Sequence, residues 1–338
     1  MKMVFLPTLD YLPQYGGVAR YLEAIKKTFP YEVAISHWQQ EGIPSAKEAT
    51  RRLFREATGY EAIWVSHILP LGTAAFRFKQ KKGVPYVIFL HGMDFDLARR
   101  TWLKRMITKK IIQSAEMVVA NSQALAYEIQ NFSGREDVMV VYPPVADEFI
   151  QAAKEVEHQP KKKIRLLTVA RLVERKGHLK VLEALQYFPE VEYRIVGDGP
   201  FKSEIERKIK ELKLSSRVSI STKISNEDIP EEYRQADIFV MPTTRTVHDR
   251  EGFGIVYLEA QLFKLPVIAV DHPGVGEAVI DKGTGFLIVD HPDALRFALK
   301  QLIDHPELRQ RMGAAGHEFV LGGFTRETQM RKLEVLLK

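Results

Sequence analysis

Cysteine is absent from the 338-residue sequence. Disulfide bonds, thiolate metal sites, iron–sulfur clusters and cysteine nucleophiles are therefore excluded. Long apolar runs are absent too, since none approaches the about 20 residues that a membrane-spanning helix needs. The amino-terminal segment has one short apolar run, Met3–Leu6, and no cleavage-site pattern, so it predicts a first β-strand rather than a signal peptide.

A strong excess of one charge is also lacking. Lysine and arginine number 49 against 43 aspartates and glutamates, which gives a formal net charge of +6. Nucleic-acid-binding domains carry a stronger and more clustered basic bias, so we expect no nucleic-acid partner. The composition, 45% hydrophobic and 27% charged, is that of an ordinary globular protein. At about 100–200 residues per domain, the length predicts two domains.

Short apolar runs alternate with longer amphipathic stretches along both halves of the chain. This rhythm predicts βαβ units and parallel sheets. The expected strands are 3–7, 32–35, 63–67, 86–90, 117–120 and 138–142 in the first half, and 165–170, 193–197, 218–222, 238–242, 267–270 and 285–289 in the second. The fold class is therefore α/β, with two Rossmann-like, doubly wound parallel-sheet domains.

A polar, charged segment marks the domain boundary. Residues 151–163 contain a proline and three consecutive lysines and precede a clean apolar strand, so we expect a linker there. We place one domain at 1–150 and a second at 163–322, with a terminal helix at about 323–338 that packs back on the first. Doubly wound domains bind ligands at the carboxyl ends of their strands, and a cleft between two domains is the default site.

The strongest motif lies where a helix is expected to begin after the strand 238–242. Gly252 and Gly254 flank Phe253 there, and glycine at a helix amino end lets a phosphate approach the backbone N–H groups. Glu251 stands just before this helix and Glu259 two turns along it. Eight helical residues span about 12 Å, comparable to the reach from a sugar across a diphosphate to a ribose. The alternative is a helix start with one dipole-favoured acid and one solvated glutamate.

Two further segments follow strands of the second half. Arg171 and Lys176 occupy the loop after the strand 165–170, where two cations suit a diphosphate, although a solvated basic loop is the alternative. The turn Gly197–Gly199 resembles half of a dinucleotide fingerprint, and a plain turn is the simpler interpretation.

In this order and spacing, the three segments resemble family 4 glycosyltransferases of the GT-B fold. That family carries two glutamates separated by seven residues, an Arg and a Lys after the first strand of the second domain, and a Gly-Asp-Gly turn. Further segments that match the family are Gly16–Val18, His91–Gly92, Asn121–Ser122, Tyr142–Val145, Pro266–Val270, Gly274–Glu277 and Gly283–Phe286.

The resemblance implies a retaining glycosyltransferase that moves a sugar from a UDP- or GDP-sugar to a glycan or lipid-linked acceptor. It implies an acceptor-binding first domain, a donor-binding second domain, no cofactor and no metal. The implied catalytic residues are Glu251, Lys176, Arg171 and His91. The implied donor-binding residues are Gly17, Arg171, Lys176, Gly197, Thr222, Lys223, Ile224, Glu251, Gly252, Phe253, Gly254, Ile255 and Glu259.

The resemblance assigns each group a part in the reaction. Arg171 and Lys176 would hold the diphosphate, Glu259 the ribose, and Glu251 and His91 the donor sugar. Fixed cations stabilise the departing charge more in the transition state than in the ground state. No second carboxylate is evident beside Glu251, unlike in retaining glycosidases, so we expect front-face attack with a diphosphate oxygen taking the acceptor proton.

Asp94, His248 and Arg250 are weaker candidates for acceptor contacts. The paired aspartates of Asp94–Asp96 follow the His91 loop and not a metal-site strand, so we expect no metal there, and the alternative for Asp94 is a turn or a helix cap. Two other functions of the same architecture stay open. They are a nucleotide-sugar epimerase, which should lack the paired glutamates, and a non-enzymatic sugar-nucleotide-binding module, which should have lost some of the site.

The expected helix 97–114 is unusually basic. Its segment Arg99–Lys110 holds six cations and no acid, with apolar residues on one half of the helical wheel. The alternatives are a sheet-covering helix with a solvated basic side and peripheral contact with an anionic membrane, which would bring the enzyme to a lipid-linked acceptor. We expect a cytoplasmic protein of bacterial or archaeal type, membrane-associated on the cytoplasmic face if the second alternative holds.

Two positions depart from the family pattern. Gly276 stands where a proline often precedes the glutamate equivalent to Glu277, and Lys264 stands where the family usually has glycine before the strand 267–270. If the backbone of Lys264 is left-handed, a lysine there costs about 1 kcal/mol.

Overall fold

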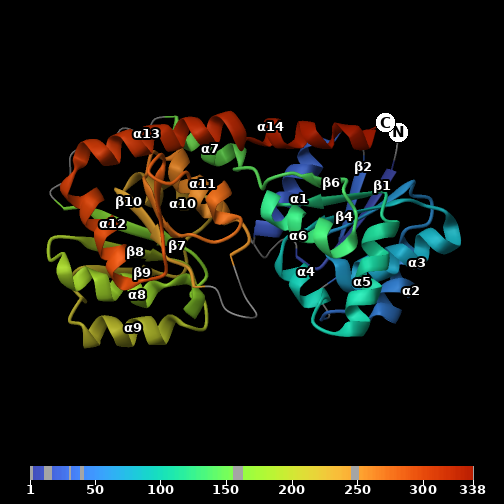
Figure 1. Cartoon of the computed structure of the whole chain (residues 1–338), viewed down its shortest axis with the longest axis horizontal. Helices are drawn as coiled ribbons and strands as arrows, with labels where there is room; N and C mark the ends of the chain where they lie inside the picture. The colour runs from blue at the N-terminus through green and yellow to red at the C-terminus, as the bar shows by residue number, and fades with distance from the viewer. Residues whose placement is uncertain are drawn as a thin grey trace. The chain divides into compact units, whose positions relative to one another are not determined.

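The computed structural model describes residues 3–10, 17–29, 32–38, 42–154, 163–244 and 251–337. The chain divides into two compact units (Figure 1). Unit 1 consists of Met1–Pro144 and Arg326–Lys338, and unit 2 consists of Val145–Thr325.

Unit 1 contains a six-stranded sheet in the order β2-β1-β3-β4-β5-β6, with every neighbouring pair parallel. Its strands are β1 (Met3–Thr8), β2 (Glu32–His37), β3 (Ala62–Val65), β4 (Tyr86–Leu90), β5 (Met117–Ala120) and β6 (Val138–Val140). The main helices are α1 (Gly17–Thr28), α2 (Ala46–Glu56), α3 (Thr73–Lys82), α4 (Met93–Ala98), α5 (Trp102–Ser114), α6 (Gln123–Ser133) and α14 (Arg326–Met330).

Both faces of the unit 1 sheet are buried. Successive residues of a strand point to opposite faces. Accordingly, Val87 and Phe89 of β4 lie in one apolar cluster, whereas Ile88 and Leu90 lie in another. Helices therefore cover the sheet on both sides (Figure 1), which explains why its strands are nearly continuous apolar runs in the sequence.

Unit 2 has a second six-stranded parallel sheet, in the order β12-β11-β10-β7-β8-β9. Its strands are β7 (Arg165–Val169), β8 (Glu192–Val196), β9 (Val218–Ser221), β10 (Ile238–Met241), β11 (Val267–Val270) and β12 (Gly285–Ile288). The main helices are α7 (Asp147–Ala153), α8 (His178–Ala184), α9 (Lys202–Glu211), α10 (Ile229–Arg234), α11 (Ile255–Leu262), α12 (Pro292–Asp304) and α13 (Pro306–Gly323). Both sheets are doubly wound, so the predicted fold class is confirmed.

The chain passes from one unit to the other at residues that differ from the linker expected at 151–163. The chain enters unit 2 after residue 144 and returns to unit 1 at residue 326. Helix α7 packs against α10 and α11 of unit 2, because its Phe149 is buried there. Residues 155–162, most of the expected linker, lie outside the described residues. At the other end of the chain, α13 packs on α11 and α14 packs on α1.

The helix expected over 97–114 is divided into α4 and α5 in the structure. Thr101 lies between them in an extended conformation, and its hydroxyl accepts a hydrogen bond from the N–H of Lys104 at 3.3 Å. A threonine in this position caps the start of a new helix. Among the described residues, none of the helices has the length and apolar character needed to cross a bilayer.

Candidate functional site

The strand order of unit 2 reverses between β10 and β7. In a doubly wound sheet, the loops that leave two such strands at their carboxyl ends diverge and leave a crevice for a ligand. The loop after β7 ends in a short 3-10 turn, Glu174–Lys176, and the loop after β10 leads to α11. The sequence motifs with Lys176 and Glu251 therefore lie at this switch point.

Glu251 is the centre of a compact ion cluster at the switch point. Its Oε2 accepts hydrogen bonds from Lys176 Nζ at 2.6 Å and from Arg175 Nη1 at 2.8 Å. The three side chains are only 10–15% exposed. The structure thus brings together two residues that the sequence predicts and adds Arg175, which the sequence analysis missed although it lies in the same basic loop.

The charge of Glu251 is set by these neighbours. Burial alone raises the pKa of a carboxyl. Here the positive charges of Lys176 and Arg175 outweigh burial and lower the pKa of Glu251 to about 2. The carboxylate is therefore ionised at neutral pH, so it accepts hydrogen bonds and does not supply a proton.

The start of α11 depends on a glycine. Gly254 is the N-cap residue with φ 82°, and a Cβ there would lie 2.5 Å from the ring of Tyr257. The Tyr257 hydroxyl donates to the carbonyl of Met241 at the end of β10. This packing holds the amino end of α11, with Gly252, Phe253 and Ile255, close to the strand ends. The free N–H groups of such a helix end attract an anion.

Glu259 lies inside unit 2. Its side chain is buried, and Oε2 accepts a hydrogen bond from the Tyr233 hydroxyl at 2.9 Å. The tyrosine comes from α10, so the contact fixes α11 against its neighbour. Ribose binding by Glu259 stays a prediction.

The remaining unit 2 candidates follow β7, β8 and β9, which are consecutive in the sheet. Arg171 is exposed, and its guanidinium forms no hydrogen bond or ion pair with any described residue. Gly197 has φ 141°, and a Cβ there would lie 1.9 Å from the carbonyl oxygen of Ala170, so glycine is needed for two loops to approach. Residues 222–224 directly follow β9.

In unit 1, His91 follows β4. Its main-chain N–H donates to Asp94 Oδ1 at 3.0 Å, and Asn121 Nδ2 donates to its carbonyl oxygen at 3.2 Å. Burial and the nearby His67 both lower the pKa of His91, and the negative charge of Asp10 raises it. The first two effects are larger, so the pKa of His91 falls to about 3. The imidazole is therefore neutral at pH 7.

Next to His91 lies the pair of His67 and Asp10. The sequence places His67 at the carboxyl end of the expected strand 63–67, where it could line a cleft, but it does not single out Asp10. His67 Nε2 is 3.2 Å from Asp10 Oδ2, and His67 Nδ1 is 2.9 Å from the hydroxyl of Ser66. The His67 hydrogen bond, which outweighs burial, lowers the pKa of Asp10. These residues follow β1 and β3, where the strand order of unit 1 reverses, so they lie at the switch point of that sheet.

The other candidates are Gly17 and Asp94 in the first half and His248 and Arg250 in the second. Gly17 is the exposed first residue of α1, and a Cβ there would meet no atom within 4 Å. The carboxylate of Asp94 is turned toward the His91 main chain, and its acceptor role stays a prediction. His248 and Arg250 lie outside the described residues. Within the described ranges, no group of three or more His, Asp or Glu side chains is placed to hold a metal ion.

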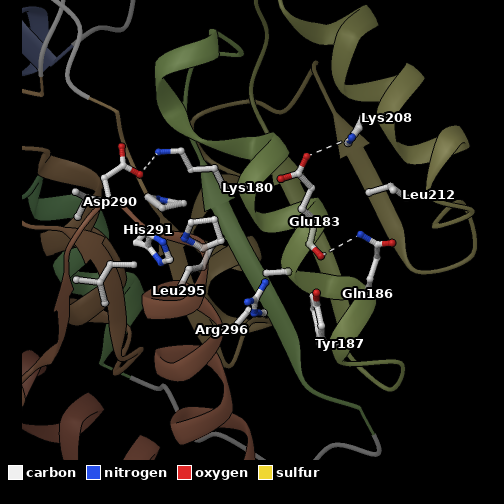
Figure 2. Close-up of a pocket in the computed structure, with 15 residues that line it drawn as sticks. Lys180, Glu183, Gln186, Tyr187, Lys208, Leu212, Asp290, His291, Leu295 and Arg296 are labelled. Carbon is white, nitrogen blue, oxygen red and sulfur yellow. Dashed lines mark hydrogen bonds and ion pairs between the residues drawn. The ribbon is translucent and has the colours of Figure 1, made fainter.

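A separate cavity of about 420 Å³ opens between α8, α9 and α12 of unit 2 (Figure 2). Neither Glu251 nor Lys176 lines it. Its lysines are already paired, Lys180 with Asp290 and Lys208 with Glu183. A diphosphate needs unneutralised positive charge. Near the switch point, the exposed guanidinium of Arg171 has no ion-pair partner among the described residues, so this cavity is a poorer match for a nucleotide diphosphate.

Comparison with known proteins gives an independent account of the chain. The family described as "Glycosyl transferases group 1" matches residues 149–319, and "Glycosyltransferase Family 4" matches residues 11–149. A "GDP-mannose-dependent alpha-(1-6)-phosphatidylinositol monomannoside mannosyltransferase" of Mycolicibacterium smegmatis is 26% identical over 376 residues, covering 99% of this chain and 98% of the relative. An alpha-D-kanosaminyltransferase of Streptomyces kanamyceticus is 25% identical and covers 68% of this chain and 64% of that protein.

Solved structures agree on the fold. Sucrose-phosphate synthase from Thermosynechococcus elongatus superposes with a TM-score of 0.81 at 19% identity, over 100% of this chain and 98% of that one. HepE from Anabaena, solved in complex with UDP-glucose, gives a TM-score of 0.82 at 19% identity, over 100% and 99% of the two chains. Together with the family matches, these findings show that the chain belongs to glycosyltransferase family 4, the group 1 glycosyl transferases, and is a retaining glycosyltransferase of the GT-B fold that uses a nucleotide-sugar donor.

Proposed function

We propose that the enzyme transfers a sugar from a UDP- or GDP-sugar to a lipid-linked or glycan acceptor. The observation that carries this proposal is the ion cluster of Glu251, Lys176 and Arg175 beside the amino end of α11. Uracil and guanine are the proposed donor nucleobases because HepE was solved with UDP-glucose and the Mycolicibacterium smegmatis relative is named for GDP-mannose.

The unit 2 site supplies fixed positive charge for the leaving group. Lys176 would neutralise the diphosphate together with Arg171, whose guanidinium is exposed. Negative charge grows on the diphosphate as the glycosidic bond breaks, so cations held in place stabilise the transition state more than the ground state. The ionised Glu251 would accept hydrogen bonds from hydroxyls of the donor sugar.

The bond changes of a front-face reaction need no protein nucleophile. The acceptor oxygen bonds to the anomeric carbon on the face from which the diphosphate leaves, and the acceptor proton passes to a diphosphate oxygen. The partners of Glu251 in the described residues are cations, not a second carboxylate, which favours this route over a glycosidase-type pair. His91 of unit 1 would contact the donor sugar through its neutral imidazole.

The acceptor side of the proposal rests on an apolar and basic surface of unit 1. Along α4 and α5, six large apolar side chains are exposed: Met93, Leu97, Trp102, Leu103, Met106 and Ile107. The same segment carries the cations of Arg99–Lys110. Exposed apolar side chains next to lysine and arginine suit the interface of an anionic bilayer. We therefore propose that this α4–α5 surface docks on anionic lipid, where a lipid-linked acceptor would be found.

The donor half of the proposal is tested by thermal shift with a panel of nucleotides and nucleotide sugars at one salt concentration. The correct donor should raise Tm according to RT ln(1 + [L]/Kd). Glu251→Gln should lose the selectivity for the sugar while it keeps binding of the nucleoside diphosphate. A panel in which no UDP or GDP compound stabilises the wild-type protein would overturn the proposed donor.

The membrane half is tested by tryptophan fluorescence with vesicles. Of the three tryptophans, Trp38 and Trp64 are buried and Trp102 is 72% exposed, so a spectral change reports on the α4–α5 surface. Vesicles with phosphatidylglycerol should shift the emission to the blue, and neutral phosphatidylcholine vesicles should not. Leu103→Ser should weaken binding, whereas Phe297→Ser, an exposed apolar residue of unit 2, serves as the matched control. Equal binding to both vesicle types would contradict the proposal.

A further inference from the structure

The main chain of His91 is held by side chains rather than by the sheet. His91 is the first residue after β4, and the next residue, Gly92, has φ 105°. The N–H of His91 donates to Asp94 Oδ1 at 3.0 Å, and its carbonyl accepts from Asn121 Nδ2 at 3.2 Å. Asn121 is itself fixed, because its N–H donates to the carbonyl of Leu90 at the end of β4. Both backbone groups of His91 therefore have a partner that a substitution can remove.

The imidazole of His91 is fixed by packing. The ring of Tyr21 meets it edge-on, with the centroids 5.5 Å apart and the planes at 82°. Tyr21 is buried in α1, and its hydroxyl donates to the carbonyl of Val141. The ring of His67 lies on another side at 6.4 Å. The imidazole therefore has little freedom to turn unless its own main chain moves.

Three buried polar atoms at and beside His91 have no hydrogen-bond partner among the described residues. They are His91 Nε2, Asp94 Oδ2 and Asn121 Oδ1. Asn121 is more than nine-tenths buried, with an exposed fraction of 7%. A buried polar atom without a partner destabilises the folded state, so a structure that keeps several in one place favours a function for them.

We propose that Asp94 and Asn121 are positioning residues that hold His91 for its contact with the donor sugar. The inference rests on the proposed function, in which His91 touches the sugar. Asp94 acts on the N–H side and Asn121 on the carbonyl side, so that Nε2 keeps one direction. A displacement of about 1 Å at a reacting group can lower a rate by about 10²-fold. Nucleotide binding depends on unit 2 residues and is independent of this loop.

Four variants separate positioning from a purely structural role. Asp94→Ala and Asn121→Ala each remove one hydrogen bond to His91. Asp94→Asn keeps a carbonyl oxygen that can accept the same N–H, so it should rescue. Asp96→Ala is the matched control, because Asp96 lies on the same helix but pairs with Arg99 at 2.5 Å.

The activity readout is hydrolysis of UDP-glucose and GDP-mannose by water, with the Kd of UDP and GDP measured in parallel. We expect about a 10²-fold fall in kcat for Asp94→Ala and Asn121→Ala, unchanged nucleotide Kd, and near wild-type rates for Asp94→Asn and Asp96→Ala. Wild-type hydrolysis rates in both alanine variants, or a loss of nucleotide affinity equal to the loss of rate, would overturn the proposal.

A second readout does not need activity. In protein labelled with ¹³C at histidine Cε1, the His91 signal is assigned with His91→Gln. It should move in Asp94→Ala and Asn121→Ala and stay in place in Asp94→Asn and Asp96→Ala. An unmoved signal in both alanine variants would overturn the positioning of His91 even if no donor were hydrolysed. Lack of hydrolysis in the wild type, with the signal moving as expected, would instead count against the proposed function.

Discussion

Both units place polar side chains at the carboxyl ends of their strands, but the surroundings of these side chains differ. In unit 2, the carboxylate of Glu251 is neutralised by two cations within 2.8 Å. In unit 1, buried atoms of His91 and Asn121 have no partner among the described residues. Two cations around one carboxylate leave one positive charge in excess, which suits an anionic ligand group. Unsatisfied neutral groups suit hydroxyls, which donate and accept hydrogen bonds without charge.

The same contrast holds for protonation. Lys176 and Arg175 overcome burial and hold the pKa of Glu251 at about 2, so unit 2 presents fixed charges. Burial lowers the pKa of His91 to about 3, so unit 1 presents a neutral ring. Under the proposed function, unit 2 would decide whether a nucleotide binds, and unit 1 would decide how fast the bound sugar is transferred.

The largest effect should come from the cations of unit 2. Lys176→Met removes a fixed charge from the leaving group and leaves Glu251 with one partner. We expect kcat to fall by about 10²–10³-fold, as for other groups that stabilise developing charge, and the Kd of the nucleoside diphosphate to rise. Steady-state kinetics and calorimetry measure the two quantities. Lys202→Met, on the exposed face of α9, is the control. Unchanged nucleotide affinity in Lys176→Met would break the contrast between the units.

The next effect separates unit 1 from unit 2. His91→Ala should lower kcat by about 10²-fold, the range for a well-placed polar catalytic group, without changing the Kd of the nucleoside diphosphate. The reason is that the proposed contact is to the sugar and not to the diphosphate. A nucleotide titration of the variant checks this directly. If His91→Ala weakened nucleotide binding as much as Lys176→Met does, the division of labour between the units would be wrong.

The sequence predicted the unit 2 side of this comparison better than the unit 1 side. Strand ends can be located from apolar runs, so the sequence places Lys176 and Glu251 on loops that follow two strands of the second half. That Arg175 also reaches Glu251 depends on the direction of a long side chain in a folded loop, which residue order does not determine. The division of 97–114 into two helices was missed because an amphipathic pattern continues through the local cap at Thr101.

The contacts around His91 were harder to predict. The sequence predicts an acceptor contact, a turn or a helix cap for Asp94, and does not identify His91 as the residue whose N–H it accepts. Asn121 lies 30 residues from His91 in the chain, and only the neighbouring positions of β4 and β5 bring them together. Such pairs become visible once the order of the strands is known.

A pH titration of stability tests the neutral ring of unit 1. Because burial holds the pKa of His91 near 3, the unfolded state, with an ordinary pKa of about 6.5, binds a proton at higher pH than the folded state does. The folded state should therefore lose about 2 kcal/mol between pH 7 and pH 5 through this group alone. His91→Gln should remove that part of the slope in urea unfolding experiments. The Glu251 carboxylate is ionised throughout this pH range when folded and mostly so when unfolded, so it should contribute little. An identical slope in wild type and variant would show that His91 is not held neutral.

The smallest expected effect tests whether the unit 2 site depends only on its local contacts. Lys264 follows α11 and has φ 58°, the left-handed conformation that costs a lysine about 1–2 kcal/mol. Lys264→Gly relieves that strain but gives the unfolded chain more freedom, worth about 0.4–1 kcal/mol. We expect a net gain in unfolding free energy of about 0.5–1 kcal/mol. Lys264→Ala, which keeps the Cβ, should gain nothing. The nucleotide Kd should be the same in both variants, because Gly254 and Glu251 set the other end of the helix; a changed Kd would mean that strain behind α11 helps to shape the donor site.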